Sequence, residues 1–186
     1  MKNLKKLIFA ALLAALTFVA TYIIKVPTPT MGYIHPGDGL VLLCGIFLGP
    51  LYGGLAAGFG SMLADLVSGY ATYAPATFII KLLTAVIASF IANELIHFWK
   101  NEKKTIAVII GSAVGELFMV LGYFVYEIFL LGILTGGLSA SAISSGIAAS
   151  AAGVPFNMVQ GIFGTIIAAV LYPILNPAIK RSLYSN

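Results

Sequence analysis

The sequence predicts an all-α integral membrane protein with six transmembrane helices in a single compact bundle. Hydrophobic residues make up 60% of the 186 residues and charged residues only 9%, whereas a soluble domain carries about 25% charged residues. Apolar stretches of membrane-spanning length recur along the chain, and they are continuous rather than alternating, which favours helices over a β-barrel. We therefore expect one domain, residues 1–186, that crosses the cell membrane several times.

The expected helices follow the apolar stretches in order. They cover residues Leu4–Ile24, Gly39–Leu48, Leu51–Val67, Ala76–Phe98, Thr105–Leu131 and Pro155–Leu175. The second helix is short for a span, and Gly49-Pro50 ends it because proline lacks an amide hydrogen. The first resembles a signal peptide, with three lysines before an apolar stretch, but its length and the lack of a cleavage site favour a retained span.

Basic residues predict the orientation, because cytoplasmic loops are enriched in lysine and arginine. With six spans, the basic segments 2–6, 100–104 and 180–181 fall on one side, and only Lys25 lies in a loop on the other. Both termini are therefore expected in the cytoplasm. Three loops then face outward, residues 25–38, 68–75 and 132–154. The first is rich in Pro and Thr and the third in Gly, Ser and Ala, and each is either a lid over a pocket or a plain connector.

Polar side chains within the expected spans gather towards the outer side. Near outer helix ends lie Asp38, Asp65, Lys81, Glu127, Asn157 and Gln160, and only Glu116 is deeper. Such residues are costly in lipid and mark functional sites. A pore needs polar groups through the whole bilayer, whereas a pocket open to one face needs them in one half. The alternative is that they pair and lock helices together, for instance Lys81 with Asp65.

Aromatic residues accompany these polar groups, either as pocket walls or as an interfacial belt. They include Tyr33, Tyr70, Tyr73, Phe78, Tyr123, Tyr126 and Phe156. The residues predicted to bind a substrate are His35, Asp38, Tyr73, Lys81, Glu116, Tyr123, Glu127, Asn157 and Gln160. Because carboxylates outnumber the one lysine, a neutral or cationic ring fits better than an anion.

Other classes of protein find little support in the sequence. Cys44 is the single cysteine, which excludes an internal disulfide and a thiolate cluster. His35 and His97 do not have the spacing of metal ligands, and no metal or cofactor is expected. The basic residues lie at helix ends rather than in a patch, so nucleic acid is not expected. No Ser/His/Asp or His-Glu-x-x-His pattern indicates an enzyme.

Small residues line one face of the first helix, where Ala10 is spaced with Ala14 and Ala11 with Ala15. Such faces let helices approach closely in lipid. Whether these alanines pack within the chain or against a partner is open from spacing alone.

Several ordered runs resemble the integral S components of energy-coupling-factor (ECF) vitamin transporters. The runs are Gly37-Asp38, Leu48-Gly49-Pro50-Leu51-Tyr52-Gly53, Gly58–Leu66 (GFGSMLADL) and Ala74–Lys81 (APATFIIK). The resemblance covers the whole chain and is nearest the subgroup for pyridoxine- or hydroxymethylpyrimidine-like rings. Riboflavin, thiamine and pantothenate remain open, and the anion pantothenate fits the charge balance worst.

The resemblance implies a mode of action. An S component captures a vitamin from outside with high affinity, docks on a transmembrane T component through Ala10, Ala11, Ala14 and Ala15, and is reoriented by two cytoplasmic ATPases. The chain has no Gly-x-x-x-x-Gly-Lys-Ser/Thr sequence, so ATP hydrolysis is expected in the partners. The alternative is a stand-alone, ion-coupled secondary transporter, although no inverted repeat is evident.

Overall fold

The computed structural model describes residues 2–137 and 139–184; Leu138, in the third predicted loop, lies outside them. The helices are α1 (Lys2–Ile23), α2 (Asp38–Val67), α3 (Ala74–Phe98), α4 (Lys104–Gly136), α5 (Ala140–Ala151) and α6 (Val154–Tyr184). Two short strands, β1 (Val26–Pro27) and β2 (Tyr33–Ile34), form an antiparallel hairpin between α1 and α2. The all-α membrane fold predicted from composition is confirmed.

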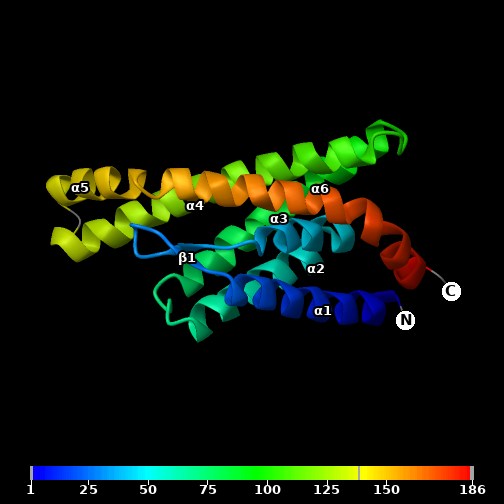
Figure 1. The fold of residues 1–186 in the computed structure, drawn as a ribbon, viewed down its shortest axis with the longest axis horizontal. Helices are drawn as coiled ribbons and strands as arrows, with labels where there is room; N and C mark the ends of the chain where they lie inside the picture. The colour runs from blue at the N-terminus through cyan, green and yellow to red at the C-terminus, as the bar shows by residue number, and fades with distance from the viewer. Residues whose placement is uncertain (1, 138, 185–186) are drawn as a thin grey trace.

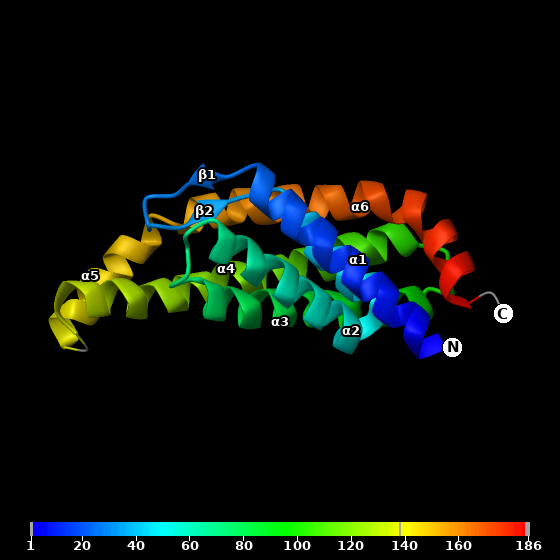
Figure 2. The same cartoon turned by 90° about the horizontal axis from the view of Figure 1, so that it is seen from below.

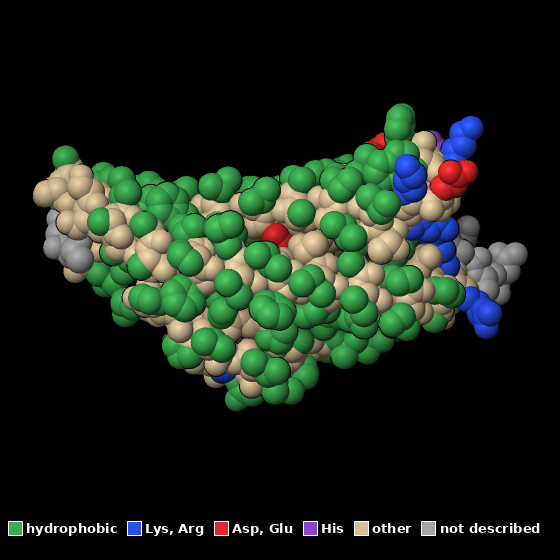
Figure 3. All heavy atoms as spheres, turned by 45° about the horizontal axis from the view of Figure 1, so that its top comes forward, with side chains coloured by type: hydrophobic (Ala, Val, Ile, Leu, Met, Phe, Trp, Pro, Cys, Tyr) green, Lys and Arg blue, Asp and Glu red, His purple; other side chains and the backbone are tan. Residues whose placement is uncertain are grey.

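The long helices run back and forth along the long axis of the molecule, and both termini lie at the same end (Figures 1 and 2). Among the described residues, five helices are long and apolar enough to cross a membrane: Asn3–Ile23, Asp38–Val67, Ala74–Phe98, Lys104–Leu134 and Val154–Leu183. Lysine and arginine side chains gather at the end that carries the termini, and apolar side chains cover most of the face in Figure 3. The bundle thus has one basic end and one end formed by the hairpin and α5.

The element α2 consists of two helical parts that fold back on each other. Gly49 has φ 81° and ψ 177°, which breaks the helix, and Pro50 begins the second part. A positive φ is accessible to glycine because it has no Cβ. A Cβ at Gly53 would clash with the carbonyl of Cys44, so the two parts are in backbone contact. The predicted pair of helices with a break at Gly49-Pro50 is confirmed.

The third predicted loop is corrected, because most of it is helical. The helix α4 continues through Gly132 to Gly136, where the prediction ended it at Leu131. Ser139 then caps α5 by accepting a hydrogen bond from the amide of Ala142, 3.2 Å away. The short helix α5 packs against α4, with Gly146 close to the carbonyl of Ile128. Small residues, read as loop signals, here allow this close contact.

The helix α6 is also longer than predicted and ends at Tyr184 rather than Leu175. Pro173 and Pro177 lie inside it. A proline removes one helical hydrogen bond and bends a helix without necessarily ending it. Figure 1 shows the resulting bend near the C-terminus.

Candidate functional site

The hairpin β1–β2 closes the end of the bundle opposite the termini (Figure 2). Val26 pairs with Ile34 and Pro27 with Tyr33. In the turn, the amide of Thr28 donates to the carbonyl of Gly32 at 2.9 Å. This Pro- and Thr-rich segment was predicted only as a loop, because strands of two residues carry no periodic signal.

Side-chain hydrogen bonds fasten the turn of this hairpin to α3 and α4. The hydroxyl of Thr30 donates to Glu127 Oε1 at 2.8 Å. The hydroxyl of Tyr73 donates to the carbonyl of Thr30 at 2.5 Å and lies 3.4 Å from Glu127 Oε1. Glu127 Oε2 is buried and has no hydrogen-bond partner among the described residues. Glu127 therefore holds the turn with one oxygen and retains an acceptor on the other.

Strand β2 and the residues after it are held by α2 and α6. The Tyr33 hydroxyl donates to Asp65 Oδ1 at 2.6 Å, and the amide of His35 donates to Gln160 Oε1 at 2.9 Å. At the start of the hairpin, Lys25 donates to Ser68 beyond the end of α2 at 2.8 Å. Elements far apart in sequence thus meet at the hairpin.

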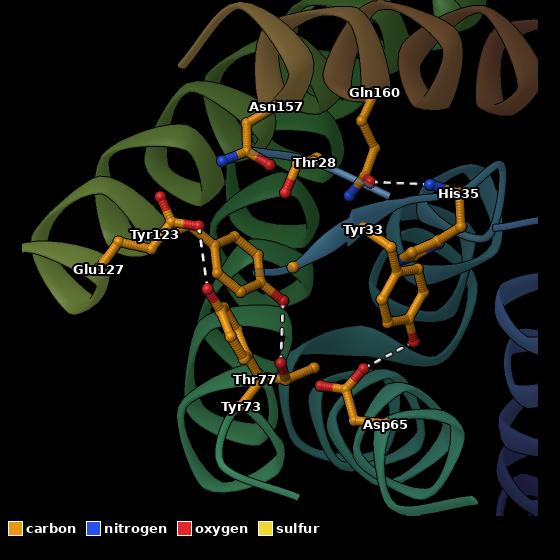
Figure 4. A pocket seen from close by; sticks show the side chains of 11 residues that line it. Thr28, Tyr33, His35, Asp65, Tyr73, Thr77, Tyr123, Glu127, Asn157 and Gln160 are labelled. Atoms are coloured by element: carbon orange, nitrogen blue, oxygen red, sulfur yellow. Dashed lines mark hydrogen bonds between the residues drawn. The ribbon is translucent and has the colours of Figure 1, made fainter. Parts of the chain in front are cut away.

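A pocket lies beneath the hairpin and is lined by Thr28, Gly32, Tyr33, His35, Asp65, Tyr73, Thr77, Tyr123, Glu127, Asn157 and Gln160. Figure 4 shows the rings of Tyr33 and Tyr123 on opposite sides of it, with Asn157 and Gln160 entering from α6. Its volume is about 20 Å³, which suffices for roughly one water molecule. A heteroaromatic ring therefore fits only if the hairpin or the lining side chains move.

The hairpin residues present neutral groups to the pocket. Burial lowers the pKa of His35 from 6.5 to about 4, against the attraction of Asp38. His35 Nδ1 accepts a hydrogen bond from the amide of Gly37 at 3.1 Å, so the proton of the neutral ring is on Nε2. Burial, and then the charge of Asp65, raise the pKa of Tyr33, which remains a phenol. None of the described lining residues is a lysine or an arginine.

A buried ion pair lies below the pocket. Lys81 Nζ is 2.6 Å from Asp38 Oδ1, and both side chains are fully buried. Asp38 Oδ2 accepts from Gln160 Nε2 at 2.6 Å, and Lys81 lies 5.2 Å from the ring centre of Tyr123. The pair thus positions Gln160 and Tyr123, which themselves line the pocket. The pairing of Lys81 with Asp65 considered from the sequence is wrong.

Glu116 does not line the pocket; it lies near Asp38 and forms part of a groove between α4 and α6. The groove has a volume of about 300 Å³, and apolar residues such as Leu117, Met158 and Ile162 make up most of its lining. Figure 3 shows one acidic side chain in a hollow of an otherwise apolar face. Neither carboxyl oxygen of Glu116 has a hydrogen-bond partner among the described residues.

Comparisons with known proteins agree with this architecture. Residues 1–177 match the family of the ECF-type riboflavin transporter, S component. The chain belongs to this family. A solved structure of the S component of a bacterial ECF transporter superposes with a TM-score of 0.62 at 25% identity, over 96% of this chain and 99% of that one.

Two curated relatives of this S component extend the comparison. The thiamine precursor transporter HmpT of Lactococcus lactis subsp. cremoris is 28% identical over 176 residues, which cover 94% of this chain and 89% of the relative. An uncharacterized protein of Pyrococcus woesei is 34% identical over 106 residues, which cover 56% of this chain and 66% of the relative. The family to which this chain belongs thus consists of vitamin or vitamin-precursor transporter components rather than enzymes.

The structure brings together only part of the predicted binding set of this S component. His35, Tyr73, Tyr123, Glu127, Asn157 and Gln160 line the pocket. Asp38 and Lys81 lie below it and Glu116 lines the groove between α4 and α6, so none of these three lines the pocket in this structure. Helical spacing predicts depth and face along one helix, but it does not show which neighbouring helix shields a side chain.

The structure places the four alanines of the predicted docking face on two sides of α1. Ala10 is 8% exposed and packs in a core cluster with α2 and α6. Ala14 is half-buried, and its carbonyl lies close to Gly60 of α2. Only Ala11 and Ala15 are exposed. Adjacent positions on a helix point about 100° apart, so the four alanines divide between an internal contact and an outer surface.

Some lining residues were absent from the predicted binding set: Thr28, Gly32, Tyr33, Asp65 and Thr77. Asp65 and Tyr33 were recognised as a polar and an aromatic candidate but were not selected. Their hydrogen bond joins α2 to β2 across 32 residues of sequence. No periodic pattern in the sequence predicts such a contact between distant elements. The signal that marks Asp65 as a site residue is its position as an acid at the end of an apolar helix.

Proposed function

We propose that this S component captures a neutral or cationic ring of the hydroxymethylpyrimidine or pyridoxine type. The observation that carries the proposal is Glu127 Oε2, a buried acceptor without a hydrogen-bond partner among the described residues, at a pocket walled by tyrosines. An amino or hydroxymethyl group on a flat ring supplies the missing donor. The similarity to a thiamine precursor transporter supports the same class of ligand.

Charge also favours this class over an anionic vitamin. Asp65 and Glu127 are the ionisable acids of the pocket lining, and no lysine or arginine is among the described lining residues. A carboxylate ligand such as pantothenate would face these acids without a cation to offset them. The polar groups Asn157 and Gln160 complete the edge contacts that a heterocycle needs.

Import is proposed to require partners. The chain would capture its ligand on the outer face of the cytoplasmic membrane, with both termini inside, as the basic residues at the terminal end favour. A T component and two ATPase subunits would then drive import, with Ala11 and Ala15 at the docking surface. Between the pocket and the terminal end, Leu42, Leu43, Ala88 and Val108 form part of an apolar core, which separates the pocket from that end.

The test is ligand binding to the purified chain. Calorimetry in detergent with hydroxymethylpyrimidine, pyridoxine, thiamine, riboflavin and pantothenate identifies the ligand, after mass spectrometry of any small molecule released on denaturation. Glu127→Gln keeps an oxygen for Thr30 but turns the free acceptor into a donor. A hydrogen bond to a charged group is worth about 1.5–3 kcal/mol, so affinity should fall roughly 10- to 150-fold.

The matched control is Glu94→Gln, an exposed acid that does not line the pocket. Its affinity should equal that of the wild type. If Glu127→Gln binds the ring with an affinity within about twofold of the wild type, Glu127 does not contact the ligand. Binding of riboflavin alone would contradict the proposed ligand and leave the family unchanged. Uptake by the chain without ATP and partners would favour the ion-coupled alternative.

A further inference from the structure

A second cavity lies at the end of the molecule that carries the termini. It is enclosed by the first part of α2, the end of α3 and the end of α6, and its volume is about 320 Å³. It shares no lining residue with the pocket beneath the hairpin. This volume is within the range of small-molecule sites, about 300–1,000 Å³.

Part of the cavity lining is apolar, and the polar side chain beside it, Asn93, is already bonded within the chain. Ile96, Ile179 and Leu183 contribute to it, and the rings of Phe47 and Tyr172 stack 5.5 Å apart. Because Pro50 has no N–H, the carbonyl of Ile46 lacks its helical donor. Asn93 Nδ2 lies 3.4 Å from this carbonyl and 3.3 Å from Ser89 Oγ. The donors of Asn93 are thus used within the chain.

The part of α6 that lines the cavity also carries donors that the described residues do not use. Tyr172, Asn176 and Lys180 are spaced four residues apart and lie along one face of α6. No hydrogen bond or ion pair of these three side chains is found within residues 2–137 and 139–184. Tyr172 is buried and Lys180 is exposed, so the donors run from the interior to the surface over about 12 Å.

The surroundings of the cavity are basic. No acid is among its described lining residues, and Figure 3 shows lysine and arginine side chains concentrated at this end. A cavity with an apolar wall, neutral donors and a lysine at its mouth matches an amphiphile whose anionic group faces the membrane surface. Basic pockets between transmembrane helices bind phospholipid headgroups in this way.

We propose that this cavity is a site for a phosphate-bearing anion, with Lys180 and Asn176 on the phosphate and the apolar wall on the attached chain. The apolar wall favours an anionic phospholipid over a soluble phosphate ester. The site is independent of the vitamin pocket and of the proposed ligand.

The test compares lipid binding to the full chain by native mass spectrometry. Phosphatidylglycerol should bind at least about tenfold more tightly than phosphatidylcholine. Lys180→Gln should reduce this preference to about threefold or less. Arg181→Gln changes the same charge at the next residue, which does not line the cavity, and should retain the preference. Thermal unfolding of each variant checks that the fold is intact.

A competition experiment with a soluble phosphate ester distinguishes the two possible ligands, a phospholipid and a free phosphate compound. Glycerol phosphate at millimolar concentration should compete with phosphatidylglycerol only if the phosphate alone is recognised. The site is supported if either probe binds the wild type and Arg181→Gln but not Lys180→Gln. Equal losses in both variants, or no preference of the wild type for either phosphate probe, would overturn the proposal.

Discussion

The buried ion pair of Asp38 and Lys81 offers the sharpest test of how this bundle is held together. Both side chains are fully buried with a separation of 2.6 Å. Lys81→Met removes the cation and leaves Asp38 with Gln160 as its hydrogen-bonding side chain. Breaking a buried pair from one side costs about 3–5 kcal/mol, because the remaining charge is uncompensated. Asp38→Asn should have a similar effect by leaving Lys81 unpaired.

The double variant Asp38→Asn/Lys81→Met should recover most of this loss. It removes both charges of the pair, and the amide introduced in place of the Asp38 carboxylate would keep an oxygen for Gln160. Replacing a buried pair by neutral groups of similar size is often nearly neutral. The coupling energy of the double-mutant cycle should therefore be several kcal/mol.

The assay is thermal unfolding in detergent, followed by the fluorescence of Trp99. For a chain of this length, 1 kcal/mol corresponds to about 2–4 °C in Tm, so each single variant should lower Tm by roughly 6–20 °C. The double variant should lie within about 5 °C of the wild type. Single variants at the wild-type Tm, or a double variant below both singles, would refute the reasoning.

Other predictions address the hairpin and the outer face of α1. Because the pKa of folded His35 is about 4 and that of an unfolded histidine is about 6.5, the folded state binds fewer protons; stability should fall by up to about 3 kcal/mol as pH decreases from 6.5 to 4. His35→Asn should lack this component in pH-dependent unfolding. Leucines at Ala11 and Ala15 should leave ligand binding unchanged but abolish co-purification with the T component and uptake.

Each of these predictions can be contradicted by a specific result. Identical pH profiles for wild type and His35→Asn would mean that His35 is not buried as a neutral ring. Normal uptake with leucine at Ala11 and Ala15 would place the docking surface elsewhere.

Sequence reasoning succeeded where a local rule is strong. The break at Gly49-Pro50 follows from two residues whose backbone preferences conflict with a continuous helix, and the structure has it there. The polar residues near one end of the bundle were recognised because lipid makes each of them costly. Three of these residues, Glu127, Asn157 and Gln160, line the pocket in the structure.

It failed where a contact across the fold decides the outcome. Asp38 and Lys81 satisfy each other below the pocket, and nothing in their separate helices shows which partner each would find. The helix α5 was read as loop, since Gly, Ser and Ala have weak signals until α4 provides a surface for them. Ala10 and Ala11 are neighbours in sequence, yet one is internal and the other external.

The closed hairpin has a kinetic consequence. Among the described residues, five hydrogen bonds join the hairpin and its flanking residues Lys25 and His35 to α2, α3, α4 and α6 or to the residues at their ends. At about 1 kcal/mol net for each, releasing all of them together requires about 5 kcal/mol, which corresponds to roughly one open molecule in several thousand. The association rate constant of a ligand that enters only the open form would be reduced by that factor. The same bonds would lengthen the residence time of a ligand once the hairpin has closed over it, so affinity in this chain would arise chiefly from slow release.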